Sequence, residues 1–286
     1  MFSWRNTFLS SFICCLLIAS GPLRASDTSN LVTASADRAN VVAFLEVTGF
    51  DVALDSIAHS AEHAPALLGQ EAADFGIQWT HVSRDVFDPS TMQAMAIDIL
   101  TQTITSQHLG HAASFYASDL GQRLVAAENA SHGDEDTEAK RLRGFEILDS
   151  MDPDSDRKDT IKRLIDAVDT SQQSLRAVQE VMVRFLMAAS HAGALEYRVD
   201  EATLRALIQK DEEAMLADMK TGGLANAAYT YRDLSNEDLV AYAEVLEHPT
   251  MQEVYQLMNA IQFEIMANRF EALAVRMADL QPAEEL

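Results

Sequence analysis

The residues whose spacing could support chemistry most directly form the segment HSAEH at residues 59–63. His59 and His63 stand four positions apart, so on a helix they share one face, as two histidine ligands of zinc do. Glu62 lies between them, where it could act as the general base of an H-x-x-E-H hydrolase. His108 and His111 form a second pair with ligand-like spacing and could complete the site. One functional hypothesis is therefore a zinc-dependent hydrolase.

Other features of these segments favour a protein without a metal or cofactor. The HSAEH segment is flanked by alanine and ends at Pro65, which is typical of a solvated helix end. The acidic run DPDSD at 152–156 places Asp152, Asp154 and Asp156 as at the start of a calcium loop. However, Arg157 replaces the turn-forming glycine and Arg163 replaces the bidentate glutamate. We expect a solvated interhelical loop there, and the sequence favours a non-enzymatic protein over an enzyme.

Composition and charge exclude some classes of partner. The chain has 286 residues, and 48% of them are hydrophobic, which indicates a folded globular protein. It carries 44 acidic against 21 basic side chains, a formal net charge of −23. Phosphate binding needs lysine and arginine to displace counterions, so nucleic acid and anionic membrane surfaces are poor partners.

The amino-terminal residues 1–25 have the pattern of a signal peptide. Arg5 precedes an apolar run at residues 8–20, which is too short to span a bilayer and is followed by a candidate cleavage site after Ala25. We therefore expect a periplasmic or secreted protein with no membrane span once the segment is removed. The alternative is an uncleaved amino-terminal anchor. Both cysteines, Cys14 and Cys15, lie in this segment, so the mature chain would fold without disulfides.

Beyond residue 36, the apolar periodicity predicts an all-α fold. Met92, Ala96, Ile99 and Leu100 recur at spacings of three and four, and strict alternation over five or more residues is absent. A longer seam from Ile161 to Ala189 has heptad-like spacing. The helices expected are 36–47, 51–64, 71–86, 89–104, 107–116, 119–130, 138–150, 157–190, 201–219, 224–232, 236–247 and 250–279.

Polar breaks divide the chain into two tandem, related multi-helix units. We expect one unit at 36–130, a linker with a bridging helix at 131–159, and a divergent repeat at 160–280. A shift of 130 positions places residues 108–130 over 238–260 with five identities, at positions 109, 113, 122, 129 and 130. In both stretches a kink follows one helix and precedes the next, at Ser118-Asp119 and at His248-Pro249, where serine or proline suits the start of a helix.

The segment FYASDLGQRL at 115–124 resembles the F-Y-x-S-P-x-G-x-K/R-L signature of a bacterial exported family, the domain of unknown function "twenty fifty-nine". FLEVTGF at 44–50 resembles its L-L-x-x-T-G-M element, in which a Thr-Gly break separates two helices. Asp119 stands where the family has proline, and an acidic residue suits a helix amino end. The resemblance implies a secreted or periplasmic helical protein with no established activity. It implies structural roles for Thr48, Gly49, Phe115, Tyr116, Ser118, Gly121 and Leu124.

The leading functional hypothesis is a binding or envelope-assembly protein. Apolar stripes left over after the core is filled would form a groove or cavity, which we expect between the two units. Its partner would be an envelope protein or an apolar ligand. The zinc hydrolase built on His59, Glu62 and His63 is the alternative.

The signal peptide yields a prediction about the exported form. The intact mass of protein recovered from the cell envelope or medium should correspond to a chain beginning at Ser26. Denatured exported protein should not react with thiol reagents, because both cysteines would be lost. A mass equal to the full chain would contradict cleavage and favour the anchored alternative.

Overall fold

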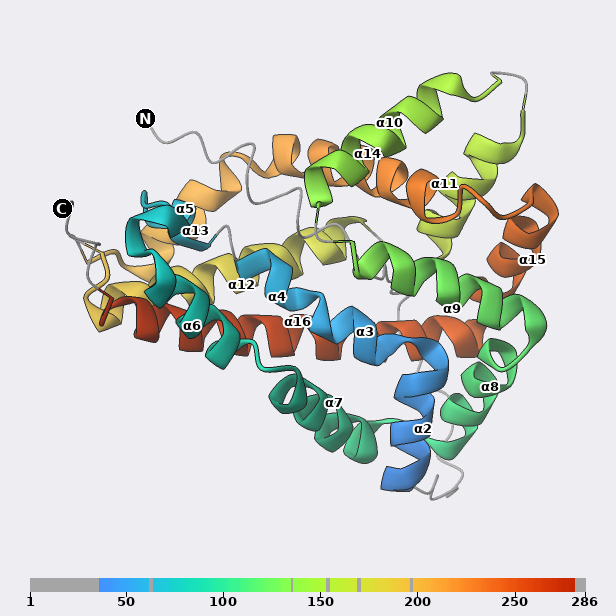
Figure 1. Ribbon diagram of the computed structural model, residues 1–286, viewed down its shortest axis with the longest axis horizontal. Coiled ribbons are helices and arrows are strands. Elements are labelled where there is room, and N and C mark those ends of the chain that lie inside the picture. The colour runs from blue at the N-terminus through green and yellow to red at the C-terminus, as the bar shows by residue number, and fades with distance from the viewer. Residues whose placement is uncertain are drawn as a thin grey trace.

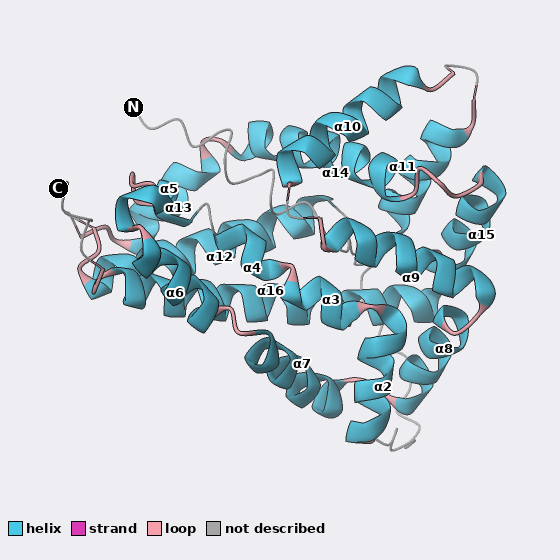
Figure 2. Cartoon of the chain, viewed as in Figure 1, coloured by secondary structure: helices cyan, strands magenta, loops and turns pink. Residues whose placement is uncertain are grey.

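The computed structural model describes residues 36–61, 64–134, 136–152, 155–168, 171–195 and 198–280. Every element in these ranges is helical and none is a β-strand, so the predicted all-α fold is confirmed (Figure 2). The predicted signal peptide, Glu62, His63 and Asp154 lie outside the described residues.

The helices follow one another along the chain with short connections. In order they are α2 (Arg38–Thr48), α3 (Phe50–Asp55), α4 (Ile57–Ser60), α5 (Ala64–Leu67), the 3-10 helix η2 (Ala72–Phe75), α6 (Ile77–Val86), α7 (Pro89–Thr103), α8 (Ser106–Tyr116), α9 (Asp119–His132), α10 (Thr137–Ser150), α11 (Arg157–Val168), α12 (Ser171–Ala192), α13 (Glu201–Gln209), α14 (Glu212–Thr230), α15 (Asn236–Leu246) and α16 (Pro249–Met277).

The long carboxyl-terminal helix α16 is the element around which the others pack. It lies along α12 and also contacts α6, α7 and α8 from the first half of the chain (Figure 1). Its buried side chains cover most of the circumference of the helix and leave a narrow exposed strip that includes Glu253, Ala260 and Glu264. A helix that is apolar on most sides must be surrounded by other elements, and α16 therefore joins the two halves of the sequence in one core.

The apolar seams predicted from spacing are buried. The residues Ile161, Leu164, Val168, Leu175, Val178, Met182, Phe185 and Ala189 are all at most 8% exposed. The seam nevertheless belongs to two helices, α11 and α12, and the single helix predicted over 157–190 is wrong. The second helix begins at Ser171, the one polar residue of the predicted seam.

Several other predicted boundaries are also wrong. The helices expected at 201–219 and 224–232 are replaced by α13 and α14, with the break at Lys210-Asp211 and an unbroken α14 through Gly222-Gly223. Packing explains the continuity, because Gly222 is buried and α14 lies tightly against α10. The helix expected at 51–64 divides at Ser56, and the one expected at 71–86 divides at Gly76, which has a φ of 52°.

The predicted linker is part of the packed structure. Its helix α10 lies against α14, and Gly144 makes the close approach possible, because a Cβ at this position would overlap the backbone carbonyl of Ala225. The buried Lys140 Nζ donates a hydrogen bond to the Ser131 carbonyl, 2.6 Å away, at the carboxyl end of α9. The division into two related units stays a prediction.

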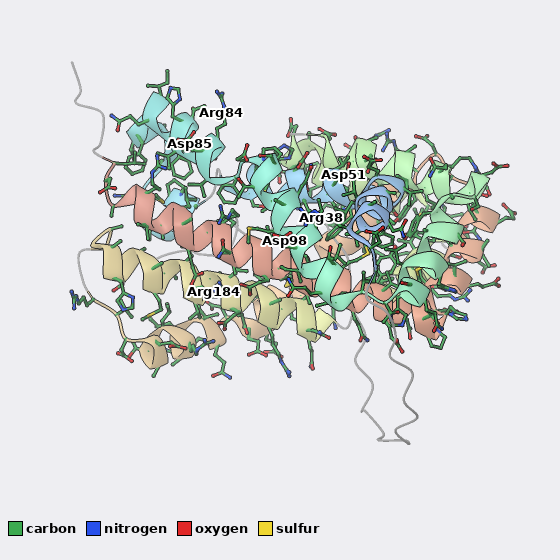
Figure 3. All side chains as sticks on the ribbon, turned by 90° about the horizontal axis from the view of Figure 1, so that it is seen from below. Arg38, Asp51, Arg84, Asp85, Asp98 and Arg184 are labelled. Atoms are coloured by element: carbon green, nitrogen blue, oxygen red, sulfur yellow. The ribbon has the colours of Figure 1, made fainter. Side chains whose placement is uncertain are left out.

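Ion pairs join helices at the surface. The Arg38 guanidinium on α2 lies 2.5 Å from the Asp98 carboxylate on α7, and Arg184 on α12 reaches Glu264 and Glu271 on α16 (Figure 3). Exposed pairs such as Arg38–Asp98 contribute little to stability. The Arg184 pairs are better placed to stabilise the fold, because the Arg184 side chain is about one quarter exposed and pairs with Glu264 and Glu271 at once. Within the described ranges no helix is long and apolar enough to cross a bilayer.

The α10–α14 contact yields a prediction about stability. Gly144→Ala should lower the free energy of unfolding by about 1–3 kcal/mol, because the added methyl group meets backbone that cannot move aside. The matched control is Gly110→Ala on the exposed side of α8, where nothing lies within 4 Å of the added Cβ. The control should raise the free energy of unfolding by about 0.5–1 kcal/mol. Denaturant unfolding measures both, and equal effects would contradict the close approach.

Candidate functional site

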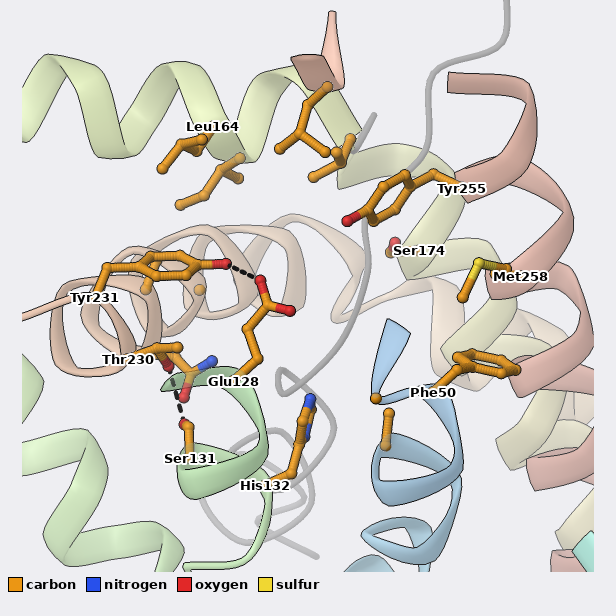
Figure 4. A pocket seen from close by; sticks show the side chains of 18 of the residues that line it. Phe50, Glu128, Ser131, His132, Leu164, Ser174, Thr230, Tyr231, Tyr255 and Met258 are labelled. Carbon is orange, nitrogen blue, oxygen red and sulfur yellow. Dashed lines mark hydrogen bonds between the residues drawn. The ribbon is translucent and has the colours of Figure 1, made fainter. Parts of the chain in front are cut away.

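A cavity of about 160 Å³ lies where the two halves of the chain meet. The first half contributes α2, α3, α8 and α9 to its lining, and the second half contributes α11, α12 and α14 to α16. Much of the wall is apolar, with Leu164, Val168, Val178 and Met258 among the lining side chains (Figure 4). The exposed Lys220 also lines it, so the cavity reaches the protein surface there.

The corner between α8 and α9 positions two of the lining residues. Tyr116 is the last residue of α8, and the Ser118 side chain caps α9 by accepting a hydrogen bond from the Gly121 backbone N–H, 3.1 Å away. Gly121 must lack a Cβ, since one would overlap the Phe115 carbonyl. This tight corner sets the direction of α9, which carries Glu128 to the cavity.

A second glycine corner brings α2 and α3 to the same place. Gly49 ends α2 with a φ of 70°, a conformation that favours glycine. A Cβ there would overlap the side chain of Asn129 on α9. Thr48 donates a hydrogen bond to the Phe44 carbonyl at 2.8 Å, and both Thr48 and Gly49 line the cavity.

Glu128 forms the polar end of the cavity. The Tyr231 hydroxyl donates a hydrogen bond to Glu128 Oε1 at 2.7 Å, and the Tyr242 hydroxyl donates to the same oxygen at 3.0 Å. Close by, Thr230 Oγ1 donates to Ser131 Oγ at 2.9 Å (Figure 4). The second oxygen of Glu128 points toward the open space between Tyr231 and Phe50 in this view.

Three tyrosine hydroxyls converge behind this carboxyl group. Tyr242 and Tyr255 lie 2.8 Å apart, Tyr116 and Tyr242 lie 3.2 Å apart, and Tyr116 also contacts Tyr255 directly. Together with Tyr231, these residues make five close contacts but hold four phenolic protons. The four protons cannot serve all five contacts at once, so the phenols must share their hydrogen bonds.

The electrostatics of the cluster follow from its burial. Burial raises the pKa of Glu128, while hydrogen bonds from Tyr231 and Tyr242 and the nearby His132 act in the opposite direction. Burial also raises the phenol pKa values of Tyr116, Tyr231 and Tyr242 well above their ordinary value. The phenols are therefore neutral at physiological pH and remain hydrogen-bond donors.

The predicted metal-binding histidines lie in different surroundings. His108 Nε2 is 2.9 Å from Glu253, and the His111 ring stacks on His248 with centroids 4.6 Å apart, both at the contact between α8 and α16. Burial and the neighbouring histidines lower the His111 pKa. In the described part of the chain no group of three or more potential ligands is arranged for a metal ion. The proposed zinc site stays a prediction, because Glu62 and His63 lie outside that part.

The remaining predicted residues lie at or beside the cavity. Phe115 stacks on Tyr242 with ring centroids 5.8 Å apart, and Leu124 is fully buried in the core. Sequence reasoning missed Glu128 and the tyrosines that partner it, Tyr231, Tyr242 and Tyr255. The sequence carries no signal for this cluster, because nothing in the spacing of its six tyrosines indicates that four of them line one cavity.

The segment that carries both Tyr116 and Glu128 matches a known protein family. Residues 90–140 match the family described as "Uncharacterized protein conserved in bacteria (DUF2059)". The resemblance predicted from the sequence is thereby confirmed over this range. The individual signature positions and the second copy stay predictions. No curated protein and no solved structure matches the chain significantly. The DUF2059 match supplies no activity.

The raised pKa of Glu128 yields a prediction about pH. Between the ordinary glutamate pKa of about 4.3 and the higher folded-state value, the native protein holds a proton that the unfolded chain has released. This group's contribution to the free energy of unfolding must therefore fall as pH rises through that window. Glu128→Gln removes this dependence and keeps an oxygen that can accept from Tyr231.

Denaturant unfolding of both proteins from about pH 4 to about pH 8 measures the effect. The stability of Glu128→Gln relative to the wild type should increase with pH. A constant difference would show that the pKa of Glu128 is not raised by folding.

Proposed function

We propose that this protein is an exported, non-enzymatic binding protein that holds a small ligand with an apolar body in the cavity between its two halves. The signal-like residues 1–25 support export. The cavity supports binding, because an apolar pocket with a few convergent polar groups at a junction between structural units is the usual form of a ligand site.

The size and lining of the cavity limit the ligand. A cavity of about 150 Å³ with apolar walls is large enough for benzene, and this one is about 160 Å³. It suits a single ring or a short branched chain. Glu128, Tyr231 and Tyr255 occupy one region of the lining, so a ligand would place a polar end there and its apolar body against Leu164 and Val178.

Ligand binding can be tested with ethylbenzene and a substitution that fills the cavity. Ala53 on α3 is 4% exposed and lines the cavity, so Ala53→Leu should occupy the space and reduce the affinity for ethylbenzene at least about tenfold. The matched control Ala126→Leu lies on an exposed face of α9 outside the lining and should leave the affinity unchanged.

Titration calorimetry gives the affinities, and the rise in thermal midpoint with ligand provides a second readout. Unfolding of Ala53→Leu without ligand checks that it remains folded. Wild-type protein that shows neither heat of binding nor a midpoint shift would refute the proposal.

A further inference from the structure

The feature that restricts the ligand further is the acidic group in the cavity. Glu128 is partly buried, and the two hydrogen bonds it accepts come from neutral phenols, Tyr231 and Tyr242. No arginine or lysine is within ion-pair distance of it among the described residues, whereas nine arginines elsewhere in those ranges have acidic partners. The nearby His132 lowers the Glu128 pKa as a positive charge does, but it acts against the larger effect of burial. A carboxylate removed from water without a close arginine or lysine is unfavourable.

The residues around Glu128 suit a positively charged group that belongs to a ligand. Tyr116, Tyr242 and Tyr255 offer hydroxyl oxygens that can accept hydrogen bonds, and Phe50 contributes an aromatic ring to the lining. Carboxylates, phenol oxygens and aromatic faces all attract an ammonium group in a site shielded from water. An anionic group placed there would instead meet the Glu128 carboxylate.

Resting on the proposed function, we infer that the ligand is an organic ammonium ion: a positively charged nitrogen pairs with Glu128, and its apolar substituent lies against Leu164, Val168 and Val178. The ammonium hydrogens are donated to Glu128 and to tyrosine hydroxyl oxygens. The acidic surface of the protein, with a formal charge of −23, raises the local concentration of such cations. The exposed Lys220 stands at the mouth, where solvent screens its charge.

Three probes of similar size and different charge test this inference on the full exported protein. They are benzylammonium, which is cationic at neutral pH, ethylbenzene, which has nearly the same shape without charge, and benzoate, which is anionic. We expect benzylammonium to bind at least about tenfold more tightly than ethylbenzene, since hydrogen bonds to charged groups contribute about 1.5–3 kcal/mol. Benzoate should bind more weakly than both.

Glu128→Gln provides the test at the level of the residue, because it removes the charge while preserving the shape. It should abolish the preference for benzylammonium over ethylbenzene. The control Glu237→Gln, at an exposed position on α15 outside the lining, should keep the full preference. The comparison of the three probes on the wild-type protein requires no variant. It therefore tests the inference even if Glu128→Gln folds poorly.

The outcomes separate the inference from the function on which it rests. Ethylbenzene binding without a preference for benzylammonium would overturn the inference and leave the proposed function intact. A preference that persists in folded Glu128→Gln would also overturn it. Failure of all three probes to bind would overturn both.

Discussion

Helix α16 is buried on most of its sides, and this single constraint organises the molecule. A helix of 29 residues with fourteen buried positions cannot be covered by one neighbour, so α12 lies along it while α6, α7 and α8 pack from the other half. The edge-to-face contacts of Phe270 with Phe87 and Phe185 join α16 to both halves at one point. The cavity lies farther along the same helix, where Tyr255 and Met258 face it and the apolar packing gives way to a polar cluster.

The polar cluster fixes the relation between the halves in a way that apolar packing alone does not. Hydrocarbon side chains tolerate small shifts, whereas the hydroxyl groups of Tyr231 and Tyr242 must lie within hydrogen-bonding distance of the Glu128 carboxyl group on α9. Tyr116 on α8 and Tyr255 on α16 must in turn reach the hydroxyl group of Tyr242. Buried networks of this kind favour one arrangement over alternatives, because each misplaced group would lose its partner. The arrangement holds a carboxyl group away from water, and the ligand preference that we propose for the cavity rests on that group.

The sequence predicted the helical class and the buried seams because both depend on local spacing, whereas structural roles for Gly49 and Gly121 came only from the family resemblance. It failed at Gly222-Gly223, where contact with α10 keeps α14 continuous although glycine weakens helices locally. It also failed to predict the site. Tyr116 could be singled out by resemblance, but its partners Tyr242 and Tyr255 are more than 120 positions away, and no periodicity relates them to Glu128. Such convergence is set by tertiary packing, which single-sequence patterns do not encode.

The position of the Gly121 corner limits which fragments of this protein could keep the contacts of Tyr116 and Glu128. Tyr116 and Glu128 flank that corner inside the segment shared with the bacterial family, yet the hydroxyl groups they contact belong to α14, α15 and α16. A fragment ending near residue 140 would lack these helices, so both side chains would lose the hydroxyl groups that they contact. Grafting the matched segment into another protein would likewise require the three carboxyl-terminal helices, because the contacts at this site extend beyond residues 90–140.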